Sequence, residues 1–132
     1  MIKLINHEGL KLWNDRFAKF NDAVLKSVSV NFTSVSPVFE MVLEAQDQES
    51  STGWSLVTIR LSKVTSLRFC DGPRSSYQVL SNGLHTLLEG ETFALELGDF
   101  IDDPESLSEL MVSPCHVVGE ILEWDAQRWP NA

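Results

Sequence analysis

Three histidines, at positions 7, 85 and 116, are the side chains that could transfer protons near neutral pH without a shifted pKa. No two of them stand four residues apart, so the H-E-x-x-H zinc motif is absent. His7 lies at the start of a predicted helix, His85 lies in a predicted strand beside a turn, and His116 adjoins Cys115. We therefore expect each histidine to have a surface or hydrogen-bonded structural role.

Nucleophiles are present without the neighbours that would activate them. No serine is flanked by glycines as in a nucleophile elbow, and neither Cys70 nor Cys115 has a C-x-x-C partner. Cys115 and His116 would point to opposite faces of a strand, so they cannot share a metal ion. Residues 72–76 (GPRSS) lack the glycine-rich loop opening a helix that cradles phosphate. We expect a protein that is not an enzyme and that holds no metal or cofactor.

Carboxylates are the most abundant reactive groups, and two sets stand close together in sequence. These sets are Asp102 with Asp103, and Glu120 with Glu123. Glycoside hydrolysis needs two acids about 5 to 9.5 Å apart in a cleft, and sequence proximity alone does not supply that geometry. The acids of residues 99–109 also miss the spacing of a calcium-binding loop. The sequence predicts a solvated acidic face.

Charge is divided unevenly along the chain. Residues 1–35 have five basic and three acidic residues, a net charge of +2, whereas residues 89–132 have one basic and eleven acidic residues, a net charge of −10. Such a field repels nucleic acid and anionic lipid and speeds the encounter with a basic partner, so we expect neither nucleic-acid nor membrane binding. The alternative is that the acids only keep a small protein soluble.

Tryptophan and tyrosine could anchor a partner at the centre of such a surface. Among Trp54, Tyr77, Trp124 and Trp129, we expect Trp129, which precedes Pro130, to be exposed, and its alternative role is to cap the core. An aromatic anchor ringed by acids suits a small inhibitor that grips a basic protein. The predicted partner-binding residues are Asp99, Asp102, Asp103, Glu105, Glu109, Glu120, Glu123 and Trp129.

A single helix is predicted at the amino-terminal end. Leu10, Trp13, Phe17 and Phe20 recur at intervals of three, four and three, which is one face of a helix over residues 6–20. Asn6 is a suitable cap for its first turn. We expect these aromatic side chains to pack in the core.

The rest of the chain alternates apolar and polar residues with the period of two that is typical of strands. Asn82 and Gly83 are predicted to form a hairpin turn between two of these strands. Residues 99–111 interrupt the alternation and predict a short helix or a lid-like loop. The predicted strands are residues 23–33, 39–45, 54–62, 64–70, 77–80, 84–89, 91–97 and 116–124.

These elements predict a mainly β (α+β) fold, an antiparallel sheet or sandwich of seven to eight strands with an N-terminal helix. A length of 132 residues, 43% of them hydrophobic, fits a single domain over residues 1–132. No apolar run is long enough for a membrane span, and polar residues interrupt the first twenty positions where a secretory signal would be apolar. A cytoplasmic location and reduced thiols are therefore expected.

Two segments carry a resemblance to known proteins. Residues 20–28 (FNDAVLKSV) begin a strand with aromatic-x-Asp-small, and residues 57–69 (VTIRLSKVTSLRF) form a later strand pair. This pattern, over about half the chain, resembles a loose group of small bacterial β-rich proteins, some of which are similar to immunity proteins of polymorphic toxin systems. The resemblance implies a structural role for Asp22 at the strand entry and a toxin-like partner.

Three functions remain open from the sequence. The first is a non-enzymatic, immunity-type inhibitor that docks a basic, toxin-like protein through its acidic C-terminal third. The second is a small-molecule-binding β domain or enzyme, which requires a cavity of about 300 Å³ or more with apolar walls and a convergent histidine or carboxylate. The third is a structural homo-oligomer subunit in which an unpaired edge strand, such as residues 116–124, pairs with that of a second copy.

Overall fold

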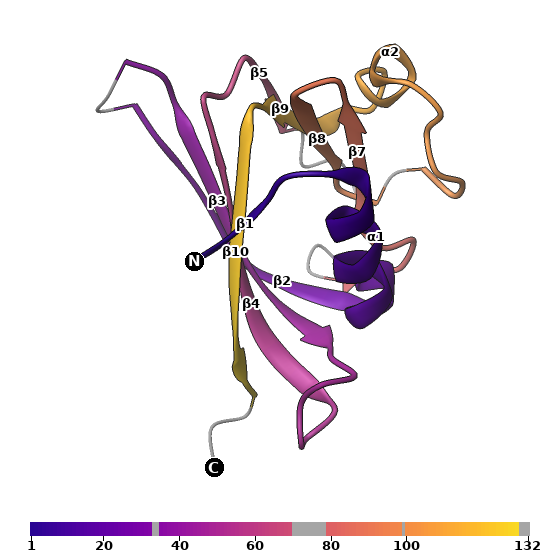
Figure 1. Ribbon diagram of the computed structural model, residues 1–132. Coiled ribbons are helices and arrows are strands. Elements are labelled where there is room, and N and C mark those ends of the chain that lie inside the picture. Colours follow the sequence, from indigo (N-terminus) through magenta and orange to yellow (C-terminus); the bar gives the residue numbers. More distant parts are fainter. Residues whose placement is uncertain (33–34, 70–78, 99, 130–132) are drawn as a thin grey trace.

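The computed structural model describes residues 1–32, 35–69, 79–98 and 100–129. It is mainly β, with two antiparallel sheets and one N-terminal helix in a sandwich-like arrangement (Figure 1). The fold class predicted from the alternation of apolar residues is therefore confirmed. No helix among the described residues is long and apolar enough to cross a membrane.

The larger sheet has six strands in the order β1-β10-β4-β3-β2-β6. Its central strands alternate strictly, so that Phe39, Met41 and Leu43 face the core while Glu40 and Glu44 face the solvent side. The strand bounds are β1 (Ile2–Leu4), β10 (Ile121–Arg128), β4 (Trp54–Ser62), β3 (Val38–Gln46), β2 (Ala23–Asn31) and β6 (Val79–Leu80).

The smaller sheet has four strands in the order β5 (Ser66–Phe69), β9 (Cys115–Gly119), β8 (Thr92–Glu96) and β7 (His85–Glu89). One of its faces adds Leu95 and Val117 to the main core against the larger sheet. Its other face packs under the short helix α2 (Leu107–Leu110), where Ala94, Leu110 and Val118 form a second, smaller apolar cluster. Cys115 is buried, as expected, and Cys70 lies outside the described residues.

Helix α1 (His7–Arg16) begins as predicted, because the Asn6 side chain accepts a hydrogen bond of 2.8 Å from the Gly9 amide. It ends earlier than predicted. Residues 18–20 have φ angles between +53° and +58° and form the turn η1 (Ala18–Phe20). This left-handed turn brings the Phe20 ring to within 5.2 Å of Phe17, between ring centroids. Trp13 and Phe17 lie in the core, as predicted.

The predicted hairpin at Asn82 and Gly83 is wrong. Strand β6 pairs with β2, and β7 pairs with β8, so this turn carries the chain from one sheet to the other. Gly83 has a φ of +77°, and a Cβ atom there would lie 2.5 Å from the Lys19 carbonyl oxygen. Only glycine fits where the turn packs against η1.

The predicted strand over residues 116–124 is also wrong, because it is two strands in different sheets. The chain crosses between β9 and β10 at Glu120, beside the crossing from β4 to β5, where the Glu120 amide donates to the Ser62 carbonyl. A Cβ atom on Gly119 would lie 2.8 Å from both Leu61 Cγ and Ser62 O, so the crossing needs glycine. Ten strands are described instead of eight because β1 was not predicted and this strand divides.

Neither half of residues 116–124 lies at a sheet edge. Strand β9 runs between β5 and β8, and β10 runs between β1 and β4. The backbone groups that would pair with a second copy are therefore used within the sheets. A homo-oligomer formed by this segment as a free edge strand is excluded.

Candidate functional site

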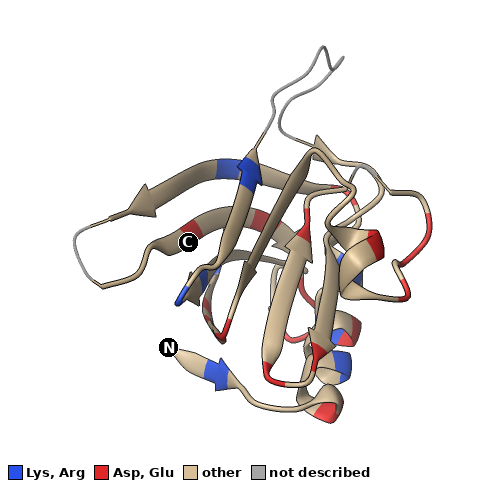
Figure 2. Ribbon diagram, turned by 90° about the horizontal axis from the view of Figure 1, so that it is seen from above, with Lys and Arg blue, Asp and Glu red and all other residues tan. Residues whose placement is uncertain are grey.

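Four of the predicted partner-binding acids lie together on the connection between β8 and β9. They are Asp102, Asp103, Glu105 and Glu109, and Figure 2 shows acidic residues along this loop and α2. A fifth, Asp99, lies outside the described residues. The negative charge of the C-terminal third is thus partly gathered at one end of the smaller sheet.

The other three predicted residues lie elsewhere. Glu120 is at the β9–β10 crossing, 3.9 Å from the Lys63 ammonium, and Glu123 is on the solvent side of the larger sheet. Trp129 is half-buried after β10, and its amide donates to the Trp54 carbonyl at 3.1 Å. The predicted exposure of Trp129 is wrong, because Trp54 is the more exposed residue, at 38%.

A groove of about 480 Å³ lies on this connection, and we call it the docking groove. Two apolar side chains in it are unusually exposed, Ile101 at 82% and Val112 at 72%. It is lined by Phe100, Ile101, Asp102, Glu109 and Val112. Sequence reasoning found its acids and missed its apolar residues, although isolated apolar residues inside an acidic segment were a usable signal.

Glu96, the last residue of β8, fixes the start of the loop. Its side chain is fully buried. One carboxylate oxygen, Oε1, accepts from the amides of Gly98 at 3.0 Å and Phe100 at 3.3 Å, and Oε2 accepts from the Ser113 hydroxyl at 2.7 Å. A buried carboxylate needs such donors, because it has left water. The two ends of the 97–114 connection are thereby tied to one side chain.

His85 lies on β7, opposite Glu96 of β8, and fixes the middle of the loop. Its Nδ1 lies 2.7 Å from Asp103 Oδ1, and its Nε2 lies 2.7 Å from the Phe100 carbonyl oxygen. Both ring nitrogens face acceptors, and only the imidazolium form donates to both. The His85 Nε2 also lies 3.8 Å from Glu96 Oε1, so the ring is beside the buried carboxylate that fixes the start of the loop.

The other two histidines are hydrogen-bonded as well. His116 Nδ1 lies 2.7 Å from the Ser113 carbonyl oxygen, and His7 Nε2 lies 2.8 Å from the Leu88 carbonyl oxygen. The expected hydrogen-bonded role is thus seen for all three. Within the described ranges, no three His, Cys, Asp or Glu side chains gather as metal ligands would.

The acids of the loop differ in the hydrogen bonds and ion pairs that they make within the protein. Hydrogen bonding to His85, and then to the Lys19 ammonium at 3.0 Å, lowers the pKa of Asp103. Glu109 Oε2 accepts from the Glu105 amide at 3.3 Å. Asp102 makes no hydrogen bond or ion pair with any described residue, so it is the acid of the docking groove most available to a partner.

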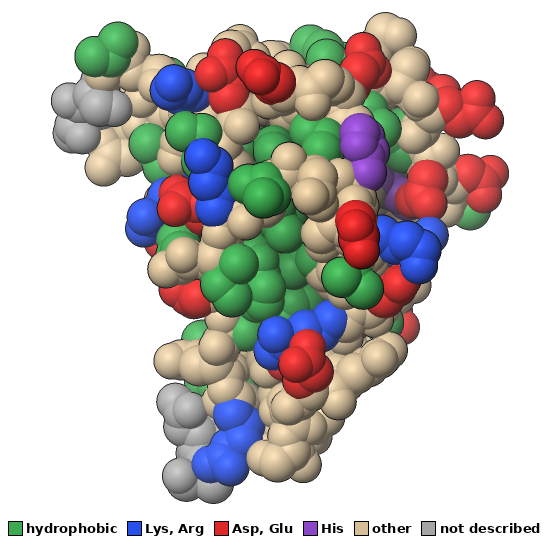
Figure 3. Space-filling model, viewed as in Figure 1, with side chains coloured by type: hydrophobic (Ala, Val, Ile, Leu, Met, Phe, Trp, Pro, Cys, Tyr) green, Lys and Arg blue, Asp and Glu red, His purple; other side chains and the backbone are tan. Residues whose placement is uncertain are grey.

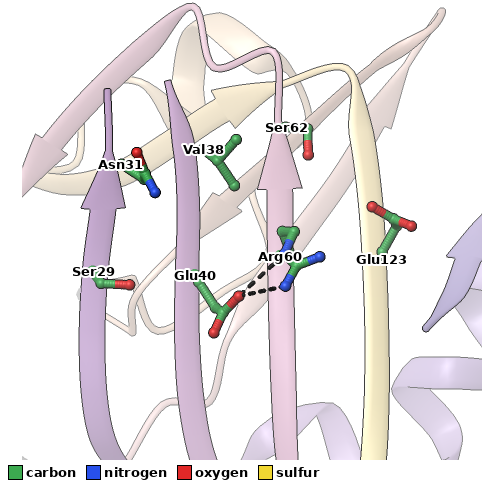
Figure 4. A pocket seen from close by; sticks show the side chains of 7 residues that line it. All are labelled: Ser29, Asn31, Val38, Glu40, Arg60, Ser62 and Glu123. Atoms are coloured by element: carbon green, nitrogen blue, oxygen red, sulfur yellow. Dashed lines mark hydrogen bonds and ion pairs between the residues drawn. The ribbon is translucent and has the colours of Figure 1, made fainter. Parts of the chain in front are cut away.

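A second hollow, of about 490 Å³, lies on the solvent side of the larger sheet. Figure 4 shows Glu40, Arg60 and Glu123 side by side on β3, β4 and β10, with Arg60 donating from Nε at 3.1 Å and Nη2 at 2.9 Å to one Glu40 oxygen. The rest of its described lining is Ser29, Asn31, Val38 and Ser62.

Both hollows bear on the second hypothesis drawn from the sequence. The hollow on the larger sheet has the required size and two carboxylates, but Val38 is the one apolar residue in its described lining. The docking groove has the size, the apolar residues and the carboxylates, yet it lies on an exposed connection and not inside a curled sheet. An exposed, acid-rimmed groove suits a segment of another protein better than an enclosed small molecule.

Comparison with known proteins adds no family to this description: no known family matches the chain, and neither a curated protein nor a solved structure proved similar to it. The resemblance to immunity proteins remains a prediction from the two sequence segments that carry it.

Proposed function

We propose that this chain is a non-enzymatic binding protein that docks a basic partner protein through the docking groove. The observation that carries the proposal is one exposed apolar pair, Ile101 and Val112, beside two carboxylates, Asp102 and Glu109. Apolar side chains so exposed are typical of surfaces that a partner covers. The carboxylates select for a partner segment that is cationic as well as apolar.

The two kinds of residue would contribute in different ways. Burial of a large aliphatic side chain contributes about 1.5 to 3 kcal/mol, so Ile101 and Val112 would supply most of the affinity. Asp102 and Glu109 would raise the association rate and give the binding its dependence on salt. The buried network of Glu96 and His85 supports this role, because a loop held in place loses less entropy on binding.

We further propose an immunity-type role, in which the basic partner is a toxin-like protein. The support for this finer statement is the resemblance of residues 20–28 and 57–69, together with the charge of −10 over residues 89–132.

Titration with a defined cationic probe tests the proposal. The probe is a short synthetic helical peptide with leucine on one face and lysine on the other, measured by calorimetry at low and at physiological salt. We expect binding that weakens as salt rises, because the Debye length shortens. Ile101→Ser should weaken binding roughly tenfold, which corresponds to about 1.4 kcal/mol of lost apolar burial. Asp102→Asn should weaken it mainly at low salt.

Glu120→Gln is the matched control, since it removes an exposed acid that lies outside the docking groove, at the β9–β10 crossing. Its affinity should equal that of the unchanged protein to within twofold at low salt, the condition in which Asp102→Asn weakens binding. Binding that is indifferent to salt, or that falls equally in Glu120→Gln and Asp102→Asn, would contradict the proposal.

A further inference from the structure

The chain has a second exposed apolar surface, and the charged residues around it are mainly basic, whereas those of the docking groove are acidic. A second groove, of about 290 Å³, lies between β1 and α1, and we call it the N-terminal groove. Ile5 and Leu12, which line it, are 72% and 63% exposed, and Ile2 is exposed beside them. Figure 3 shows hydrophobic side chains gathered near the centre of the view, where β1 and α1 lie in Figure 1.

The charges that line the two grooves are complementary. Lys3 and Arg16 line the N-terminal groove with one acid, Glu49. Arg16 is held by Asp47, with 2.9 Å between Nε and Oδ1, and by Glu49, whereas exposed Lys3 makes no ion pair with any described residue. Among the described residues that line the docking groove there are two acids and no cation. One free cation, Lys3, therefore matches one free acid, Asp102.

We propose that copies of this chain associate head to tail, with Ile101 of one copy seated in the N-terminal groove of the next and Asp102 beside Lys3. The proposal rests on the proposed function, because it uses the docking groove as a binding surface. The contact joins two different surfaces, so a row of copies keeps one free groove at each of its two ends.

A symmetric contact through β1 is the competing arrangement, because β1 is an edge of the larger sheet. A row of alternating charge runs across that sheet on neighbouring strands. It consists of Glu40, Arg60, Glu123 and Lys3. Pairing all three residues of β1 with those of a second β1 would place Lys3 opposite Lys3. Like charges directly opposite are destabilising, so the row favours an acid next to Lys3.

Head-to-tail association would also regulate the docking groove. A copy seated on it covers Ile101 and Asp102, so a basic partner must displace that copy before it can bind. The cationic peptide probe should therefore dissociate the assembled copies.

Sedimentation velocity on two complementary variants tests the proposal. Ile101→Ser damages the docking groove and Leu12→Ser damages the N-terminal groove, and both residues are exposed, so the fold should be retained. Each variant alone should need at least about tenfold higher concentration to associate. An equimolar mixture should form a one-to-one dimer at the concentrations where the unchanged protein associates, because each variant retains the surface that the other lacks.

Phe32→Ser is the matched control, an exposed apolar residue on neither groove, and it should associate like the unchanged protein. Three outcomes would overturn the proposal: a monomer at every concentration at low salt, a dimer lost in Leu12→Ser but kept in Ile101→Ser, or no dimer in the mixture. Peptide binding without self-association would overturn this inference and leave the proposed function standing. Self-association lost in Ile101→Ser, with no peptide binding, would support the inference and count against a cationic foreign partner.

Discussion

Asp103 links three parts of the molecule through one carboxylate. Its two oxygens meet His85 of β7 at 2.7 Å and Lys19 of the η1 turn at 3.0 Å. The docking loop is thus held by a residue that is itself more than half exposed. Because water screens this site, its contribution to stability is smaller than that of a buried pair.

The pKa of Asp103 is lower in the folded protein than in the unfolded chain, so its contribution depends on pH. It stabilises the fold fully above the unfolded value, near 3.9, and is lost as the pH falls through the lowered folded value. Asp103→Asn should therefore cost about 1 kcal/mol or less near pH 7 after allowance for exposure. Urea unfolding of both proteins from about pH 7 to about pH 2.5 should show this difference shrink towards zero. A difference that stays constant over that range would count against the assignment.

Elements whose apolar residues recur strictly could be predicted from the sequence. The alternation in residues 39–45 and 54–62 and the stripe from Leu10 to Phe17 required only local periodicity. The turn at Asn82 and Gly83 was placed, but its change of sheet and the crossing at Gly119 could not be predicted, because the choice of partner strand depends on distant residues.

The candidate site, too, could be predicted from the sequence only in part. Its acids were visible as a local excess of charge, whereas the groove depends on His85 meeting Asp103 and on Glu96 meeting Ser113, pairs that are 18 and 17 residues apart in sequence.

Gly119→Ala should destabilise the protein by about 1 to 3 kcal/mol, because the added methyl group would crowd Leu61 and Ser62 where the two sheets meet. Chemical denaturation measures the loss. Gly90→Ala is the control, since nothing lies within 4 Å of its Cβ position and only the strain of a φ of +62° remains. If the two variants lose equal stability, crowding at the crossing is not the cause.

At the scale of the whole molecule, the two sheets share one corner. The β4–β5 and β9–β10 connections cross there side by side, and the Lys63 ammonium lies 3.9 Å from a Glu120 oxygen. One continuous core, from Phe17 and Phe39 to Leu95 and Val117, fills the space between the sheets. Neither sheet can therefore lose its partner without exposing its own apolar face.

The shared core predicts that both sheets unfold together. Thermal unfolding followed by far-ultraviolet circular dichroism and by calorimetry should give one transition, with equal van't Hoff and calorimetric enthalpies. Two separated transitions, or a calorimetric enthalpy well above the van't Hoff value, would show that the smaller sheet unfolds on its own.

The indole N–H groups of Trp13 and Trp124 are buried without a hydrogen-bond partner among the described residues, and their rings lie 6.5 Å apart between centroids. Trp54 and Trp129 lie together at the far end of β4 and β10, in partial contact with water. The chain thus contains two natural pairs of fluorophores in unlike surroundings. Blue-shifted emission would report on the packing of α1 against the larger sheet, and red-shifted, easily quenched emission would report on the sheet's outer end, with no added label.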